Sequence, residues 1–197
     1  MYPLAYIEPV FRPPSEWKSL IVQVTNGCSW NRCTFCEMYT ADQKRFNHKP
    51  IEQIEQELMS IQRQGLPVRR VFLADGDAMT LSVRRLTDVL KCIQRIFPEV
   101  QRVSSYCLPR NLKHKSVDEL TELKALGLDL LYVGCETGDD ALLNIINKGE
   151  SFDTSLSALQ KIKAAGMQSS VMILNGLGGM HHSVNHAQNS ARLMNDR

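Results

Sequence analysis

The stretch SLIVQVTNGCSWNRCTFC, residues 19–36, joins an apolar, β-branched run to three closely spaced cysteines. Residues 19–25 predict a buried strand, which an Asn-Gly turn pair ends. Cys28, Cys33 and Cys36 follow at once, so the three thiols are expected on the loop at the carboxyl end of this strand. Three thiolates are one ligand short of a closed tetrahedral metal site. The stretch therefore raises the question of what takes the fourth place.

The rest of the chain alternates apolar runs with amphipathic segments. The further strands are expected at residues 69–75, 101–108, 128–135 and 169–175. The helices are expected at residues 50–64, 81–97, 116–127, 139–148, 153–165 and 183–195. Such alternation predicts an α/β fold with parallel strands and right-handed crossovers. A doubly wound sheet and a partial (β/α) barrel both fit the pattern.

The overall composition limits the class of protein. The chain has 197 residues, a formal net charge of +2, 43% hydrophobic and 22% charged residues. This balance argues against a strong polyanion-binding surface and thus against a nucleic-acid partner. The first 17 residues do not resemble a signal peptide, and no apolar run reaches the roughly 20 residues of a membrane span. Six cysteines, three of them clustered, favour metal chemistry in a cytoplasmic protein over a disulfide framework.

Polar or glycine-rich residues follow each of the five expected strands. The cysteines follow the first strand, and the sequences ADGDAM, YCLPRN, CETGDD and NGLGG follow the other four. In both candidate architectures ligands bind at the carboxyl ends of the strands. The five strand ends together therefore predict one binding site.

The cysteine loop alone leaves three interpretations open. A four-iron cluster normally takes four thiolates, so three would leave one iron free to bind a small molecule. Zinc in a Cys₃His set, with His48 as the fourth ligand, is a second interpretation. Buried cysteines without a ligand are the third.

Several motifs together resemble the radical S-adenosylmethionine (radical SAM) superfamily. In GCSWNRCTFC, the aromatic Phe35 before the third cysteine matches the family pattern, whereas the four residues between the first two cysteines replace the commoner three. FLADGDAM stands where the family has a Gly-Gly-Glu element, and VMILNGLGG resembles the fifth-strand segment beside adenine. LYVGCETGDDALLNIINKG resembles the fourth-strand signature of the branch related to oxygen-independent coproporphyrinogen oxidase. The resemblance runs from about Pro13 to the last residue.

The resemblance implies an enzyme with two cofactors. Cys28, Cys33 and Cys36 would bind three irons of a [4Fe-4S] cluster, and S-adenosylmethionine would chelate the fourth. An electron donor such as flavodoxin or ferredoxin would reduce the cluster, which would then cleave S-adenosylmethionine to a 5′-deoxyadenosyl radical. That radical would abstract hydrogen from a substrate that the motifs do not identify. A noncatalytic iron–sulfur protein and a zinc-stabilised binding module are the alternatives.

The resemblance also implies which residues bind S-adenosylmethionine. The Gly76 backbone and the Asp77 carboxylate would meet its ammonium group, although Asp77 is one methylene shorter than the family's Glu. Glu136 would reach the ribose or the amino group, and Ser105 and Arg110 the carboxylate. Ordinary roles for these residues are a capped turn, a solvated strand end and a surface arginine.

The adenine would lie between Phe35 and the segment from Ile173 to Gly176. Cys107 and Cys135 are expected as structural thiols, and His181, His182 and His186 as parts of a polar loop and helix start.

The expected domain organisation is a lead-in segment at residues 1–18 and a core domain at residues 19–197. The family core is generally a partial barrel of six strands, whereas five are expected here. The fifth strand, 169–175, would then be an exposed edge. We therefore expect this chain alone to cleave its cofactor with poor coupling to substrate turnover.

Overall fold

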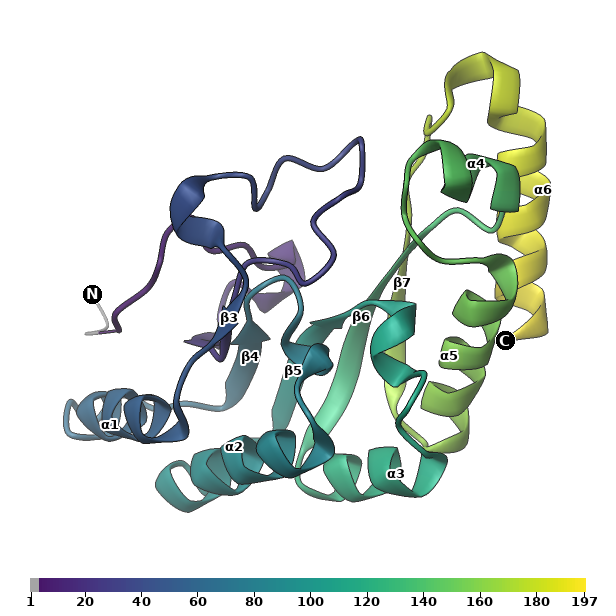
Figure 1. The fold of residues 1–197 in the computed structure, drawn as a ribbon. Helices are drawn as coiled ribbons and strands as arrows, with labels where there is room; N and C mark the ends of the chain where they lie inside the picture. Colours follow the sequence, from purple (N-terminus) through teal and green to yellow (C-terminus); the bar gives the residue numbers. More distant parts are fainter. Residues whose placement is uncertain (1–3) are drawn as a thin grey trace.

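The computed structural model describes residues 4–197, which form a curved parallel sheet with helices along one face (Figure 1). The five strands lie in the order β1 (Leu20–Gln23), β4 (Arg70–Ala74), β5 (Arg102–Cys107), β6 (Leu128–Glu136) and β7 (Gln168–Ile173). The helices are α1 (Ile51–Gln62), α2 (Val83–Ile96), α3 (Val117–Ala125), α4 (Asp140–Ile145), α5 (Phe152–Ala164) and α6 (Gly179–Asp196). Short 3₁₀ turns are η1 (Pro14–Glu16), η2 (Asp42–Lys44), η3 (Ala78–Thr80) and η4 (Pro109–Leu112). Strand order follows chain order, as in a partial (β/α) barrel.

The predicted first strand is too long at its carboxyl end. β1 ends at Gln23, and the following residues form β2 (Thr25–Asn26), which pairs antiparallel with β3 (Asn47–His48). Each of these strands has only two residues, which are too few to give a pattern in the sequence. This second sheet was therefore not predicted. The hairpin closes the long loop that begins with the cysteines.

Two helix predictions also need correction. α4 ends at Ile145, before the predicted 148, because Asn147 and Gly149 have φ values of 52° and 70° and turn the chain out of the helix. α6 begins at Gly179, four residues before the predicted 183. The strands β4 to β7 and the helices α1, α2, α3 and α5 lie close to their predicted positions.

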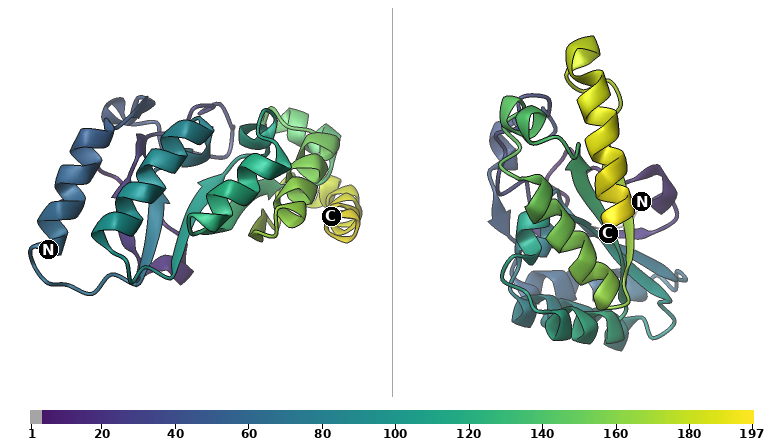
Figure 2. Two further views of the ribbon diagram at one scale, coloured as in Figure 1. Left: turned by 90° about the horizontal axis from the view of Figure 1, so that it is seen from below. Right: turned by 90° about the vertical axis from the view of Figure 1, so that its right-hand side faces the viewer.

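The main apolar core lies between the sheet and the row of helices that Figure 2 shows from two sides. Buried residues such as Leu73, Leu90 and Leu131 belong to it. α3 and α5 each begin with a serine cap in a capping box, which fixes where these helices start. Within residues 4–197, no helix is long and apolar enough to cross a membrane.

The inner, concave face of the sheet carries an aromatic cluster. The ring centroid of Phe72 lies 5.1 Å from that of Tyr106 and 6.1 Å from that of Tyr132, both edge to face. The N-terminal segment packs against this cluster through Val10, and Ser15 and Tyr132 share a hydrogen bond of 2.7 Å. The lead-in segment thus packs against the inside of the barrel.

A buried ion pair ties the N-terminal segment to the strand ends. The Lys44 ammonium donates to the Asp75 carboxylate, and both side chains are fully buried. Lys44 also donates to the Ile7 carbonyl at 2.9 Å, while Gln23 donates to Asp75 at 3.3 Å. The backbone N–H of Gly27, next to the first cysteine, donates to Asp75 at 3.4 Å. One carboxylate therefore joins β1, the N-terminal segment and the cysteine loop.

Candidate functional site

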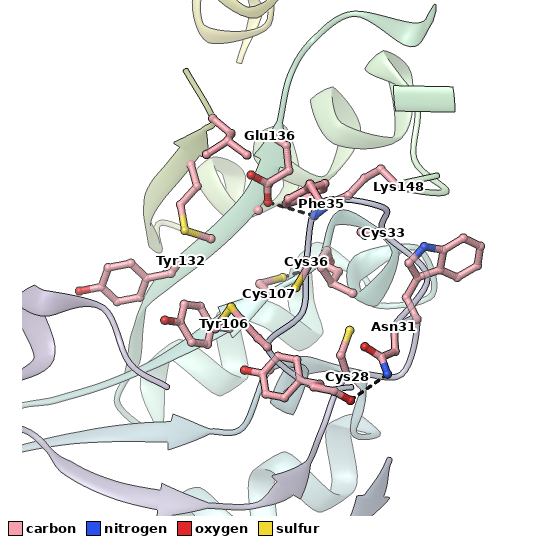
Figure 3. A pocket seen from close by; sticks show the side chains of 18 of the residues that line it. Cys28, Asn31, Cys33, Phe35, Cys36, Tyr106, Cys107, Tyr132, Glu136 and Lys148 are labelled. Atoms are coloured by element: carbon pink, nitrogen blue, oxygen red, sulfur yellow. Dashed lines mark hydrogen bonds and ion pairs between the residues drawn. The ribbon is translucent and has the colours of Figure 1, made fainter. Parts of the chain in front are cut away.

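The three clustered cysteines line one pocket at the carboxyl ends of the strands. The pocket has a volume of about 400 Å³, and Cys28, Cys33 and Cys36 are each half-buried free thiols in its wall (Figure 3). Among the other predicted site residues, Phe35, Gly76 and Glu136 line the same pocket. Strand ends distant in the sequence thus meet as the strand-end argument predicted.

Asp77 lies beneath the cysteine loop and is not part of the pocket wall. Its carboxylate is fully buried and accepts hydrogen bonds from both the backbone N–H of Ser29, at 3.2 Å, and the Ser29 hydroxyl. Burial raises the pKa of Asp77, and the bonds from Ser29 oppose that shift. In this structure Asp77 supports the residue that follows Cys28.

Ser105 and Arg110 also lie outside the pocket wall. Ser105 is fully buried, and its hydroxyl donates to the Leu73 carbonyl at 3.2 Å. Arg110 forms an ion pair with Glu150 at 2.7 Å and lies over the Trp30 ring. Both predicted carboxylate-binding groups therefore already have protein partners.

The predicted segment from Ile173 to Gly176 meets the pocket through Leu174, and neither of its two end residues lines the wall. Met172 and Leu174 line the pocket, whereas Ile173 packs against the main core. Alternation along the strand explains this, because neighbouring side chains point to opposite faces. Gly176 has φ of 81° in an exposed turn beyond the strand.

Glu136 and Lys148 form an ion pair in the pocket wall. Glu136 was predicted as a site residue from the sequence, whereas Lys148 was not. Lys148 Nζ lies 3.1 Å from Glu136 Oε1, with side-chain exposures of 5% and 12%. Glu136 has φ of 66°, and Gly134 leaves it room, since a Cβ there would lie 2.9 Å from Glu136 Oε1. Lys148 belongs to the fourth-strand sequence LYVGCETGDDALLNIINKG, so the sequence could have pointed to it as a site residue.

The environment of the cysteines perturbs their acidity. Burial raises the pKa of the Cys28 thiol, against hydrogen bonds from the backbone N–H groups of Asn31 and Trp30. Burial likewise raises the pKa of Cys33, against the positive charge of Lys148. Binding a metal must release these protons, because the thiolate is the ligand.

The described part of the chain provides no preformed Cys₃His set. Within residues 4–197, no three His, Cys, Asp or Glu side chains converge on a position for one metal ion. His48 lies exposed on the short strand β3. A cubane cluster makes a different demand, since each thiolate binds its own iron at a separate corner. Three separated thiols around a pocket fit that donor pattern.

A fourth cysteine, Cys107, lines the same pocket from the end of β5 (Figure 3). It is 1% exposed, burial raises its pKa well above the ordinary value, and its thiol donates to the Leu108 carbonyl at 3.3 Å. Cys135 is fully buried, and burial raises its pKa to about 12. His186, one of the three histidines considered above, is buried, and its Nδ1 shares a hydrogen bond of 2.8 Å with the Thr137 hydroxyl.

A partial (β/α) barrel with three cysteines after its first strand defines the class of fold and site. Residues 22–189 match the family described as the Radical SAM superfamily, and this chain belongs to that superfamily. The cofactors of the superfamily are a [4Fe-4S] cluster and S-adenosylmethionine.

Individual relatives are distant and much longer. The 4′-phospho-dehydrooxetanocin synthase of Priestia megaterium is 24% identical over 200 residues, which cover 89% of this chain and 26% of that protein. The structure of the cobalamin-dependent radical enzyme OxsB, with aqua-cobalamin and S-adenosylmethionine bound, has a TM-score of 0.69 at 16% identity over 89% of this chain and 26% of its own. Coproporphyrinogen III oxidase (HemN) from Escherichia coli, described as a radical SAM enzyme, has a TM-score of 0.67 at 19% identity over 89% and 41%. These likenesses show the fold, and this chain spans about a quarter of the first two relatives.

Proposed function

We propose that this chain binds a [4Fe-4S] cluster through Cys28, Cys33 and Cys36 and binds S-adenosylmethionine in the adjoining pocket. Together, these bound cofactors supply one-electron cleavage of a sulfonium bond and hydrogen abstraction from a substrate still to be identified. The observation that carries the proposal is the meeting of three half-buried thiols in one pocket of about 400 Å³. A flavodoxin- or ferredoxin-like protein is the proposed electron donor.

The polar pair in the pocket wall would orient the second cofactor. Lys148 offers a positive charge to a carboxylate, and Glu136 offers an acceptor to an ammonium or hydroxyl group. Both side chains are almost excluded from water, which strengthens their electrostatic interactions. Neither charge would be left alone before binding, because each neutralises the other.

The remaining wall would exclude water and admit a flat ring. Phe35, Met172 and Leu174 present apolar surface to the pocket. Gly76 and Tyr39 line the pocket as well, and the Tyr39 ring packs directly on the glycine, since a Cβ there would lie 2.3 Å from the ring. A reactive radical needs such shielding from solvent.

Anaerobic reconstitution with iron and sulfide tests the proposal. We expect a brown protein with four irons a chain, a cluster spectrum that changes when S-adenosylmethionine is added, and 5′-deoxyadenosine after dithionite reduction. A colourless zinc protein would contradict the proposal. A brown protein whose spectrum ignores S-adenosylmethionine would be a noncatalytic iron–sulfur protein.

The pocket pair offers a variant that separates the two cofactors. Lys148→Met with Glu136→Gln removes both charges together, so no unpaired buried charge remains. We expect the iron content to stay and the affinity for S-adenosylmethionine, measured by calorimetry, to fall. Unchanged affinity would place the binding site elsewhere.

A further inference from the structure

The structure assigns to Trp30 a role that the family motifs do not include: we propose that it is a positioning residue that sets the separation of Cys28 and Cys33 before a metal binds. The inference rests on the proposed function only in taking these two cysteines as ligands. Trp30 lies among the four residues between them, where the commoner spacing has three.

The indole of Trp30 is held on two sides. Its Nε1–H donates to the Asn147 carbonyl at 2.8 Å. The guanidinium carbon of Arg110 lies 4.0 Å from the ring centroid, within the range of a cation–π contact. Arg32, within the loop, adds a longer contact of 5.3 Å to the same centroid. Since Asn147 and Arg110 come from outside the loop, the ring fixes the loop to the rest of the fold.

Arg110 is itself immobilised, so the stack is rigid. Its Nε donates to Glu150 Oε1 at 2.7 Å, and its backbone N–H donates to the same oxygen at 3.1 Å. Its Nη2 donates to the Lys148 carbonyl at 2.6 Å. The Glu150 side chain is 2% exposed and also accepts from the Thr154 hydroxyl at 2.9 Å. A buried carboxylate at the start of α5 therefore holds the cation that covers Trp30.

The turn after α4 is shaped to receive the ring. Gly149 has φ of 70°, and a Cβ there would lie 2.4 Å from Trp30 Cζ2 and 2.6 Å from Arg110 Nη2. A side chain at this position would displace both members of the stack. The glycine thus gives a second way to disturb Trp30 without replacing it.

The same turn also binds the backbone on both sides of Cys33. Asn147 Nδ2 donates to the Arg32 carbonyl, and the Thr34 N–H donates to the Ile146 carbonyl, each at 3.0 Å. Next to Cys28, by contrast, Ser29 is anchored to the end of β4 through its bonds to Asp77. The two cysteines are therefore attached to different parts of the barrel, and Trp30 spans the interval between these attachments.

Site-resolved alkylation of the metal-free protein, read by mass spectrometry, tests the inference without any activity assay. In Trp30→Ala and in Gly149→Ala, we expect the alkylation rates of Cys28, Cys33 and Cys36 to rise about tenfold. Trp30→Ala removes the cation–π contacts with Arg110 and Arg32 and one hydrogen bond, and Gly149→Ala displaces the ring from Arg110. The rate of Cys92 should stay at the parent level, because this residue lies on α2, outside both the loop and the pocket. Trp30→Phe keeps a ring under Arg110 and should restore part of the protection.

The matched control is Trp17→Ala, since Trp17 is the other tryptophan and is 63% exposed. It should leave all rates unchanged. With Trp17→Phe as background, the emission of Trp30 becomes a single reporter, and Gly149→Ala should shift that emission toward longer wavelength.

Two results would overturn the inference. One is alkylation of the three loop cysteines at the parent rate in both Trp30→Ala and Gly149→Ala. The other is an equal rise at Cys92, which would mark general loosening of the fold. Protection of the loop that depends on Trp30 in a protein that never takes up iron would keep this inference and reject the proposed function.

Discussion

The carboxylate of Asp77 accepts two hydrogen bonds from Ser29, one from the backbone N–H at 3.2 Å and one from the hydroxyl. Asp77 ends the turn after β4, and Ser29 directly follows the first cysteine. The sequence motif assigns Asp77 to the ammonium group of a cofactor, whereas the structure engages it beneath the cysteine loop. Its first function in this fold is to support that loop.

The first prediction concerns this support. Asp77→Ala leaves the two Ser29 donors without their acceptor and should lower the free energy of unfolding by about 1–3 kcal/mol. We also expect fewer irons a chain after reconstitution, because the residue beside Cys28 loses its anchor. Urea titration and iron analysis measure the two effects.

Asp88→Ala is the control for that variant, since Asp88 lies exposed on α2. It should change neither the unfolding free energy nor the iron content. If Asp77→Ala instead keeps all its iron and its stability and loses only affinity for S-adenosylmethionine, Asp77 belongs to the cofactor site after all.

The second prediction identifies the cluster ligands. Replacing Cys28, Cys33 or Cys36 by Ala one at a time should prevent stable binding of four irons, because each thiolate holds a separate corner. Cys92→Ala, in the buried face of α2, should reconstitute like the parent protein. A single loop variant that still holds four irons would show that its cysteine is not an essential ligand.

The order of the fold could be read from the sequence because it depends on long, repeated signals. Five apolar strands and their helices extend over many residues each, so that hydrophobic spacing identifies them. The cysteine loop and the fourth-strand signature were likewise contiguous in the sequence. Residues that follow a parallel strand must meet at one rim, which is why Cys28 and Glu136 were placed together correctly.

Orientation and long-range pairing could not be read in the same way. Asp77 and Ser29 are far apart in the chain, and nothing local shows that a carboxylate after β4 points under a loop after β1. Ile173 and Leu174 differ by one step of strand alternation, and the motif VMILNGLGG alone does not show which of them faces the site. The pairing of Lys44 with Asp75 could not be predicted either, because the loop that carries Lys44 has no regular sequence pattern.

The third prediction tests the buried pair that joins the N-terminal segment to the cysteine loop. Lys44→Met leaves the Asp75 carboxylate buried without its cation and should lower the free energy of unfolding by about 3–5 kcal/mol. Adding Asp75→Asn should restore part of the loss, because it removes the uncompensated charge. Urea titration of the single and double variants measures the coupling.

Arg95→Ala provides the comparison for Lys44→Met. Arg95 pairs with Glu55 at 2.7 Å on the surface, with side-chain exposures of 61% and 34%. Exposed pairs of this kind contribute little, so the unfolding midpoint should hardly move. Equal effects of Lys44→Met and Arg95→Ala would show that burial of the Lys44 pair does not matter to stability.

The fourth prediction concerns the pH dependence of the free energy of unfolding. It rests on Glu16, which is fully buried. Tyr132, which lines the pocket, donates to Glu16 Oε1 at 2.7 Å, and Arg102 Nη2 lies 2.7 Å from the same oxygen. Burial by itself raises the pKa of Glu16, but hydrogen bonds from Ser19 and Tyr132 and the charge of Arg102 outweigh it, so the pKa is lowered. The folded state therefore favours the ionised carboxylate.

The sign of the effect follows from that direction. A carboxyl group with a lower pKa in the folded state stabilises the fold fully above its unfolded pKa, which is about 4.3 for Glu. This stabilisation disappears as the pH falls through the folded-state pKa. Glu16→Gln, which keeps the shape and removes the charge, should thus be less stable than the parent at pH 7 and approach it in acid.

Urea midpoints measured from neutral to acid pH give the difference, and Glu99→Gln, at an exposed turn, is the control. A difference between parent and Glu16→Gln that stays constant over this range would show that the charge of Glu16 does not stabilise the fold.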